Sequence, residues 1–461
     1  MNAAATTAGN DEARFRPAAL LPFRQLALMA AYWFGINAVW GGYEWFGQTQ
    51  VELMVGRDAR GTVNGLMEGL GALVAVLVVP TIGTISDYTT SRFGKRKGYI
   101  ITGAFFDLLF LAGLALLASP EPSAWDGQAI GTPALMVVYA ILFLGLQFSS
   151  NFAQGPYQGF VPDLVAEPQV GLASGMVGGM RMAGQVGGAL IMMILGAGLQ
   201  LWGPALLLIA IIEFGLAAAT FYWVSDGPPA KPREGRSWRE VALESWGTDL
   251  LRERSFLRMS LVRFLFLMST GLFINISAWY LRDSLGQTEG DRTFWGIVAL
   301  AALSVATLVT VLPAARLSDR VGRKPVIWAA CASAAVGLAL IAIAPSPPVA
   351  VLGLAIMGSA SGAYLSADWA LMTETIPLVA SGRYMGLANI ANSLSGPVGA
   401  FIAGAFVIDR LTAAGMIGAG PRVAVAIFIP ALAIAAIVLR GVHPRRDPRG
   451  SATIGAAGAE G

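Results

Sequence analysis

The chain has 461 residues, of which 55% are hydrophobic and only 13% are charged, and its formal net charge is +3. So apolar a composition is not that of a soluble globular domain and indicates a polytopic membrane protein. The apolar runs are unbroken, which excludes a transmembrane barrel of alternating strands, and the basic residues lack the clustered aromatic surface of a nucleic-acid binder.

Apolar runs of roughly 20 residues, each long enough to cross a bilayer as a helix, recur about twelve times and predict an all-α polytopic fold. The residues before the first run lack the apolar core and cleavage site of a secretory signal, so we expect a short solvated arm there. We expect the tail from Gly441 to be disordered. The predicted helices cover residues 25–48, 62–86, 99–118, 132–154, 170–199, 204–224, 257–281, 292–314, 325–344, 348–372, 384–408 and 421–440.

Lys and Arg are concentrated in alternate loops. Because cytoplasmic loops retain positive charge, this asymmetry predicts that both termini are cytoplasmic and that the protein is a multi-pass component of a cell (inner) membrane. The lone Cys331 excludes an internal disulfide and a multi-thiolate metal site, and the lone His443 lies in the tail. We therefore expect no metal and no cofactor, and any proton relay in the membrane must use carboxylates.

A charged loop, GTISDYTTSRFGKRKGYI at 83–100, has an abbreviated copy, ARLSDRVGRKPV at 315–326. The chain therefore reads as a tandem repeat, with an N-terminal six-helix half at 1–224, a cytoplasmic linker at 225–256 and a C-terminal half at 257–461. Within the linker, an apolar side predicts a surface helix on the inner leaflet. That side consists of Trp238, Val241, Trp246 and Leu250.

The duplicated G-x-x-x-D-x-x-G-[RK]-[RK] loop, in about twelve helices with a long central linker, resembles the major facilitator superfamily. The first copy, D-Y-T-T-S-R-F-G-K-R-K, is expanded as in the glycoside-pentoside-hexuronide and sucrose-type symporters, and NFAQGPYQGFVPDL at 151–164 is similar to a segment of those families. The chain departs from them at Tyr88, Gly98 and Ala315. The resemblance implies transport by alternating access.

The resemblance also implies that the two loops hold an inner gate shut. Gly83 would let its helix approach a neighbour. The cations Arg92, Lys95, Arg96 and Lys97 offer Asp87 partners and could also contact anionic lipids. In the gate that the resemblance implies, Asp87 would act with Arg92, and Asp319 with Arg320 and Arg323. For Lys95 and Lys97 we expect a role in setting membrane topology rather than in the gate. The predicted gating residues are Gly83, Asp87, Arg92, Gly94, Arg96, Asp319, Arg320, Gly322 and Arg323.

Polar residues form stripes on otherwise apolar helices, and a polar group inside a membrane normally faces a cavity. The clearest stripe is Trp33, Asn37, Trp40, Glu44 and Gln48, which share one helix face. Four of the striped helices are those that line the central cavity in the family fold. The predicted substrate-binding residues are Asn37, Trp40, Gln147, Asn151, Arg181, Gln185, Asn275, Trp279, Tyr364, Asn389 and Asn392.

The predicted cation-coupling residues are Glu44, Glu68 and Asp368. Glu44 and Glu68 could instead only reach the outer headgroups. Arg181 near the midplane predicts contact with substrate or a carboxylate, with snorkelling to the interface as the alternative. Asp107 and Glu213, on peripheral helices, predict structural pairing.

These patterns predict a monomeric secondary transporter, a proton-coupled symporter of a small polar solute such as a sugar or glycoside. The sugar symporters place an acid on the fourth helix where this chain has Gln147 and Asn151, which argues against sodium coupling. Alternatives are an exporter of amphipathic or anionic small molecules and a non-transporting assembly factor. The chain lacks D-D-x-x-D, H-E-x-x-H and P-loop motifs, so we expect no enzymatic activity.

Overall fold

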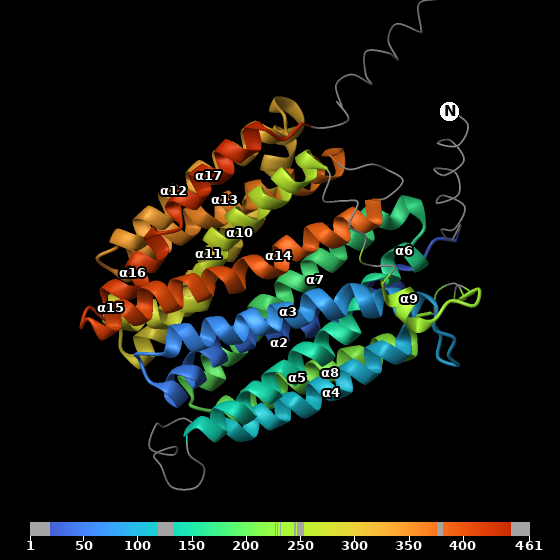
Figure 1. Cartoon of the computed structure of the whole chain (residues 1–461), viewed down its shortest axis with the longest axis horizontal. Coiled ribbons are helices and arrows are strands. Elements are labelled where there is room, and N and C mark those ends of the chain that lie inside the picture. The colour runs from blue at the N-terminus through green and yellow to red at the C-terminus, as the bar shows by residue number, and fades with distance from the viewer. Residues whose placement is uncertain are drawn as a thin grey trace, which may run out of the picture. The chain divides into compact units, whose positions relative to one another are not determined.

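The computed structural model describes residues 19–118, 132–225, 227, 229–230, 232–243, 246, 253–375 and 381–443. Every regular element in this part of the chain is a helix (Figure 1). The long helices are α2 (Phe23–Val55), α3 (Arg60–Asp87), α4 (Lys97–Leu117), α5 (Thr132–Gln158), α7 (Val170–Ile191), α8 (Trp202–Trp223), α10 (Arg254–Trp279), α11 (Glu289–Val321), α12 (Arg323–Ile343), α13 (Pro347–Thr375) and α14 (Ser381–Ala403). Shorter helices are α6 (Phe160–Leu164), α9 (Trp238–Leu243), α15 (Asp409–Ala413), α16 (Ala419–Ala426) and α17 (Ile429–Arg440).

The predicted spans and the observed helices agree closely. In the part of the chain that the structure describes, 11 helices or helix pairs are long and apolar enough to cross a membrane. The first helix, α2, is also long enough, with 33 residues, but carries the polar stripe. The largest differences are at the ends of α2 and α11, which extend the apolar runs by about two turns of charged or polar sequence.

Three of the long helices continue as π-helical segments. Met192–Gly198 follows α7, Tyr280–Ser284 follows α10, and Gly404–Ile408 follows α14. A π-helical turn rotates the side chains that follow it, and such turns are frequent at functional sites. Tyr280–Ser284 contains Arg282 and Asp283, and Gly404–Ile408 directly precedes Asp409; these charged residues are described below.

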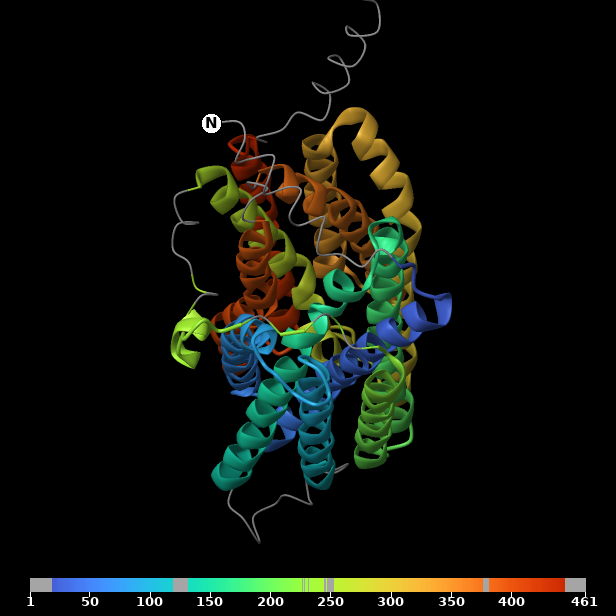
Figure 2. The ribbon, with the colours of Figure 1, turned by 90° about the vertical axis from the view of Figure 1, so that its right-hand side faces the viewer.

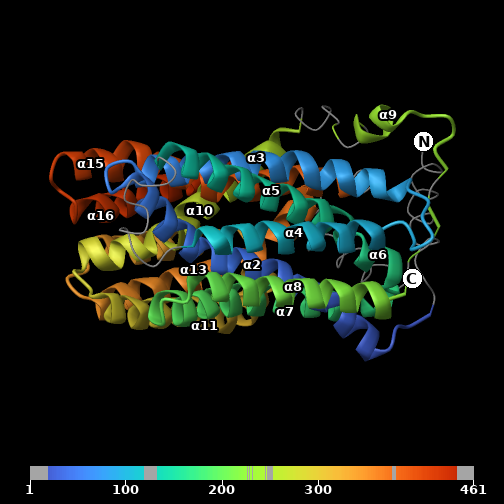
Figure 3. The ribbon, with the colours of Figure 1, turned by 90° about the horizontal axis from the view of Figure 1, so that it is seen from below.

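The chain forms two compact units. Unit 1 comprises Met1–Trp246, Leu272–Leu300 and Gly396–Ala424, and unit 2 comprises Gly247–Gly271, Ala301–Ser395 and Val425–Gly461. In unit 1, α2 packs against α7 and α8, α3 against α5, and α4 against α5 and α8 (Figures 1 and 3). In unit 2, α12 packs against α13 and α17.

Glycines permit the close contact of α2 with α7. A Cβ atom on Gly184 or Gly188 would collide with the backbone carbonyl groups of Phe34 and Ala38. Small residues of this kind let membrane helices approach at backbone distance. By contrast, a Cβ atom on Gly175 or Gly178 of the same helix would meet no described residue within 4 Å.

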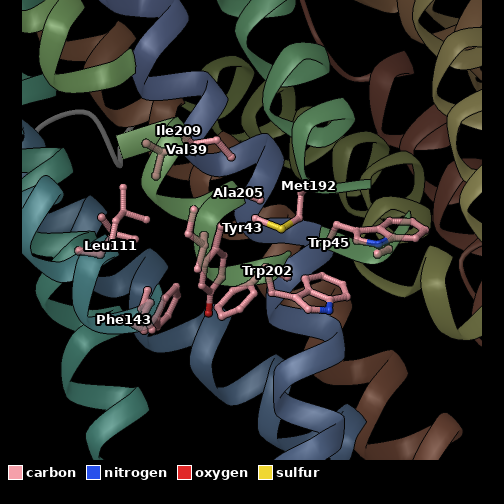
Figure 4. Packing of buried hydrophobic residues seen from close by; sticks show 14 of the residues in the cluster. Val39, Tyr43, Trp45, Leu111, Phe143, Met192, Trp202, Ala205 and Ile209 are labelled. Atoms are coloured by element: carbon pink, nitrogen blue, oxygen red, sulfur yellow. The ribbon is translucent and has the colours of Figure 1, made fainter. Parts of the chain in front are cut away.

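An aromatic core holds α2 in place at the level of Tyr43. Its ring stacks on Phe143 of α5 at 4.8 Å, and its hydroxyl shares a 2.6 Å hydrogen bond with the hydroxyl of Tyr139. Figure 4 shows the rings of Tyr43 and Phe143 together with Met192 and Trp202. The packing fixes the rotation of α2 and hence the direction of its polar stripe.

Two acidic residues, Asp107 of α4 and Glu213 of α8, are fully buried next to each other. Ser149 donates a hydrogen bond to Asp107, and the Tyr32 hydroxyl donates one of 2.9 Å to Glu213 Oε1. Buried polar groups need such partners. The contacts agree with the predicted structural role of the pair.

The linker helix α9 packs against α3 near the end of that helix (Figure 2). Val241 is fully buried, and Trp246 Nε1 donates a 3.2 Å hydrogen bond to Thr81 Oγ1. Trp238 is 44% exposed, and Leu250 lies outside the described residues. The prediction that this apolar side faces lipid was therefore wrong for Val241 and Trp246, because they face protein.

Candidate functional site

The polar stripe of α2 lies in unit 1 beside α7. Asn37, Trp40 and Glu44 are half-buried, whereas Trp33 is 5% exposed. The Asn37 amide donates a 2.7 Å hydrogen bond to the Trp33 carbonyl, and Gln185 Nε2 of α7 donates one of 2.9 Å to Glu44 Oε2. Two predicted residues from different helices, Glu44 and Gln185, therefore form one polar group.

Arg181 lies one turn before Gln185 on α7. Its guanidinium carbon is 4.8 Å from the centre of the Trp33 ring, a cation–π contact. Its side chain is exposed, and within the described parts of the chain it forms no ion pair. The described neighbour of Arg181 is thus an aromatic ring, and its hydrogen-bond donors remain available to a ligand.

Glu68 of α3 is half-buried and close enough to Glu44 for the two carboxyl groups to interact electrostatically. Neither carboxyl forms an ion pair with a described residue. Two ionised carboxyl groups that lie close together repel each other, so a bound cation or proton would stabilise the pair.

Gln147 and Asn151 of α5 are almost fully buried, at 7% and 6% exposed. The Asn151 amide donates hydrogen bonds of 2.7 Å to the Gln147 carbonyl and of 3.2 Å to Gln147 Oε1. A Cβ atom on Gly71 of α3 would collide with the Gln147 amide. The structure therefore places these two amides at the contact of α5 with α3.

The second-half residues Asn275 and Trp279 of α10 belong to unit 1, where Gln48 of α2 contacts their helix. Gln48 Nε2 donates a 2.7 Å hydrogen bond to the Ile274 carbonyl, and Gln48 Oε1 accepts one of 3.2 Å from the Ala278 N–H. Asn275 is half-buried, whereas Trp279 is 2% exposed. Gln48 thus joins the end of the α2 stripe to α10.

Beyond Gln48 lies a group of charged residues that we call the distal ionic cluster, because it occupies the end of unit 1 where α2 ends and α3 begins. It consists of Glu52, Arg60, Arg282, Asp283 and Asp409. Arg60 donates to Glu52 Oε2 at 2.9 Å and to Asp283, and Arg282 donates to Glu52 Oε2 and Asp283 Oδ1, each at 2.8 Å. Arg60 is fully buried, with its guanidinium 4.8 Å from the Trp279 ring.

Asp409 completes the cluster from the start of α15. Its two carboxylate oxygens accept hydrogen bonds of 2.9 Å from the Gly61 N–H and 2.7 Å from the Thr62 N–H. A carboxylate at a helix N-terminus satisfies free N–H groups and complements the helix dipole. Gly61 also touches the backbone of Gly404, where no Cβ atom would fit.

The sequence predictions did not include the distal ionic cluster. No local spacing relates its members, because Glu52 is more than 200 positions from Arg282. The π-helical segments before Asp409 and around Asp283 orient these carboxylates, and periodicity does not reveal such segments.

At the opposite end of unit 1, Arg96 is the centre of the first charged loop. It donates hydrogen bonds of 2.7 Å to Asp87 Oδ1, 2.6 Å to Asp163 Oδ2 and 3.1 Å to the Pro156 carbonyl. Lys95 adds an ion pair of 2.9 Å with Asp163. Thus Arg96, and not the predicted Arg92, is the cation paired with Asp87, and Lys95 has a structural contact beyond topology.

The two loop copies share a turn. Gly94 and Gly322, at equivalent positions, have φ angles of +89° and +99°, a region that favours glycine. In the second copy Arg323 pairs with Asp319 and donates a 3.1 Å hydrogen bond to Ser318 Oγ. Gly83 lies opposite Gly155 of α5, so α3 approaches α5 there as predicted.

Unit 2 contains a separate buried group around Asp368 of α13. Arg263 of α10 donates from Nε at 2.9 Å and also from Nη2 to Asp368 Oδ2, and the Tyr364 hydroxyl donates at 2.8 Å to Oδ1. The Tyr364 ring stacks on Phe266 at 3.8 Å. The sequence analysis did not predict that Arg263 pairs with Asp368. A cation within an apolar run is nevertheless a signal, because a charge inside a membrane helix normally has a partner.

The remaining predicted residues are on α14 and in the second loop. Asn392 is exposed, and the Asn389 side chain lies outside the described residues. Arg320 is near the end of α11 and is exposed.

Comparison with known proteins gives one family. A model of the Major Facilitator Superfamily matches residues 27–400 and again residues 259–459. Among curated relatives, the sucrose transport protein SUT1 of Oryza sativa subsp. japonica is 29% identical over 116 residues, 23% of this chain and 20% of the transporter. For this relative and for the minor myo-inositol transporter IolF of Bacillus subtilis, the matched segment spans about a fifth of the relative's length. The multidrug resistance protein MdtG of Proteus mirabilis is 25% identical over 329 residues, 66% of this chain and 79% of that protein.

Solved structures give the same fold. A bacterial homologue of the human lysosomal transporter Spinster has a TM-score of 0.68 at 15% identity, covering 91% of this chain and 97% of that one. The D-xylose-proton symporter has a TM-score of 0.62 at 16% identity, covering 91% and 97%. The predicted all-helical membrane fold is confirmed.

Proposed function

We propose that this protein is a proton-coupled symporter of a sugar or glycoside. The chain belongs to the Major Facilitator Superfamily, and so is a multi-pass secondary transporter of small molecules and not an enzyme. On this proposal, its nearest relatives within the superfamily are the sucrose-type and glycoside-pentoside-hexuronide symporters. The two halves, 1–224 and 257–461, would act as the two moving bodies of a monomer in the cell inner membrane, with both termini cytoplasmic.

The observation that carries the proposal is the group formed by Trp33, Asn37, Trp40, Arg181 and Gln185. It combines indole rings with amide and guanidinium donors, and its polar members are half-buried or exposed in the middle of membrane helices. Aromatic rings stack on the apolar faces of sugar rings, while amides and guanidinium groups hydrogen-bond the hydroxyls. Few fixed charges lie in this group, which favours an uncharged polar solute.

Glu44 is the proposed coupling residue, with Glu68 as its neighbour. Glu44 accepts a hydrogen bond from Gln185, so occupancy of the solute site and the charge of Glu44 can influence each other. A proton on one carboxyl removes the repulsion between the two. Asp368, the third candidate, is held by Arg263 and Tyr364, and we assign it to positioning within unit 2.

The two charged ends of unit 1 are the proposed gates. The distal ionic cluster would close the outer side, because it joins the α2–α3 turn to α10 and α15. The first charged loop, with Asp87 and Arg96, would belong to the inner gate. Alternating access then requires these buried pairs to separate and re-form in turn.

Export of amphipathic or anionic compounds is the second candidate. It is favoured by the extent of the similarity to MdtG, which covers a larger share of this chain than the sucrose transporter does. Arg181 would then contact an anionic group of the substrate.

A thermal-shift panel on the purified protein separates the two candidates, since a ligand of the folded state raises the melting temperature. The panel contains disaccharides, aryl glycosides, nucleosides, organic anions and amphipathic cations. Stabilisation by a sugar or glycoside that is lost in Trp33→Ala supports the proposal. Stabilisation only by amphipathic or anionic compounds would replace it with the exporter.

A further inference from the structure

A small cavity lies outside the solute site, between the loop that precedes α4 and the end of α8. It has a volume of about 290 Å³ and is lined by Arg92, Phe93, Gly94, Lys97 and Phe221. Two of its five lining residues are cationic, two are aromatic and none is acidic. The cavity therefore has the chemistry of a site for an anion with an apolar part.

The charge of Arg92 has no hydrogen-bonding or ionic partner in the described part of the chain. Its guanidinium carbon lies 4.5 Å over the Phe93 ring, and it forms no hydrogen bond or ion pair with any residue that the structure describes. Arg96, four positions further on, is nearly buried and neutralised by Asp87 and Asp163. The loop thus divides its cations between an internal network and an external cavity.

The start of α4 adds to the positive potential. This helix begins at Lys97, has no side-chain cap at its N-terminus and has no acidic residue in its first turn. The first N–H groups of a helix attract anions. Here that end of the helix meets the same cavity through Lys97.

The aromatic side of the cavity places it at the membrane surface. Phe93 is 44% exposed, and its ring lies 5.4 Å from that of Phe221. The next two residues of α8, Tyr222 and Trp223, are 75% and 57% exposed. Exposed Tyr and Trp at a helix end are typical of the interface between headgroups and hydrocarbon.

We propose that this cavity binds the headgroup of an anionic phospholipid, with its phosphate between Arg92 and Lys97 and its first acyl carbons against Phe93 and Phe221. The aromatic walls favour a lipid over a soluble anion, because a free phosphate gains nothing from them. Basic residues beside a membrane helix attract anionic lipids, whereas a choline headgroup would bring a cation towards two cations.

The test is lipid retention in native mass spectrometry, with the full-length protein released from detergent after equilibration with phosphatidylglycerol or with phosphatidylcholine. We expect the wild type to retain phosphatidylglycerol preferentially, and each of Arg92→Gln and Lys97→Gln to lower its apparent affinity about fivefold. Arg233→Gln is the matched control, because Arg233 also lies 4.5 Å over an aromatic ring, Trp238, but does not line the cavity.

The outcomes are distinct. Equal retention of phosphatidylglycerol by wild type, Arg92→Gln and Lys97→Gln would overturn the site, as would an equal loss in Arg233→Gln. A second measurement, melting temperature in lipid-free detergent with added inorganic phosphate, separates lipid from free anion. Stabilisation by millimolar phosphate equal to that by phosphatidylglycerol would overturn the lipid as occupant, and unchanged melting of the variants without lipid shows that they fold.

Discussion

Arg60 and Asp283 form a buried ion pair although they are 223 positions apart in the chain. Their side chains are 0% and 3% exposed. The pair joins the first residue of α3 to the π-helical segment that ends α10. Removing one partner of a buried pair leaves an uncompensated charge, which typically costs about 3–5 kcal/mol.

The first prediction concerns this pair as an outer gate. Arg60→Gln should favour the state in which the distal end is open, because Asp283 and Glu52 then lose the more buried of the two arginines that they share. A cysteine placed at Thr49, in a Cys331→Ala background, should react at least about tenfold faster with a membrane-impermeant thiol reagent added outside. The rate of labelling measures the change.

Arg57→Gln is the control for that experiment. Arg57 pairs with the same Glu52 at 3.4 Å, but its side chain is 50% exposed. Such an exposed pair contributes at most about 1 kcal/mol. Labelling in Arg57→Gln should therefore remain near the wild-type rate, and equal labelling in Arg57→Gln and Arg60→Gln would contradict the gate.

The second prediction concerns the first charged loop. Asp163→Asn should lower the melting temperature more than Asp87→Asn, because Asp163 accepts from both Lys95 and Arg96 and is less exposed. Arg92→Gln in lipid-free detergent should leave melting unchanged, since Arg92 has no described ion pair. Scanning fluorimetry of the three variants gives the order, and the reverse order would show that Asp163 is not the main counter-charge of Lys95 and Arg96.

Asp87→Asn should also loosen the inner gate, because the amide keeps the shape of the side chain but removes its charge. We expect faster labelling of a cysteine placed in the inner part of the solute route, from the cytoplasmic side. An unchanged rate would show that the loop contributes stability to the first half only.

The sequence was sufficient for the helices and insufficient for the pairing of their charges. Apolar runs of membrane length have few alternatives to a helix, so the spans were predictable within about two turns. The direction of the α2 stripe was also predictable, because Asn37, Trp40 and Glu44 share one face at helical spacing. Gln185 then meets Glu44, as two stripes on neighbouring helices should.

Ion pairs were predictable only where they are local. Asp319, in the last turn of α11, and Arg323, the first residue of α12, are only four positions apart, and the sequence indicated their contact. The family resemblance predicts that Asp87 acts with Arg92, but the positive φ angle of Gly94 turns the chain so that Arg96 reaches Asp87. Contacts such as Arg263 with Asp368 depend on helix packing, which one sequence does not specify.

The third prediction tests that contact. Arg263→Met and Asp368→Leu should each lower the free energy of unfolding by about 3–5 kcal/mol. The double variant should lower it by clearly less than the sum of the two single effects. The reason is that the double change leaves no buried charge without a partner. Melting temperatures and urea unfolding provide the double-mutant cycle, and strict additivity would show that the pair does not act as a unit.

The fourth prediction concerns Arg181. Arg181→Lys should weaken binding of the solute found in the thermal-shift panel by roughly tenfold, because a point charge does not reproduce the planar donor fork or its stacking on Trp33. The melting temperature without solute should change little, since the side chain is exposed. Wild-type affinity in Arg181→Lys would make Arg181 a structural residue.

The most direct test of the account is solute-driven proton movement in proteoliposomes that contain a pH-sensitive dye. For the sugar or glycoside that stabilises the protein, we predict that its addition outside acidifies the lumen in the wild type, and that Glu44→Gln abolishes this signal while counterflow exchange of the same solute continues. Glu68→Gln is measured beside it, as the neighbouring carboxyl. Solute entry without any proton signal in the wild type, or an undiminished signal in the double variant Glu44→Gln, Glu68→Gln, would contradict proton coupling through this pair.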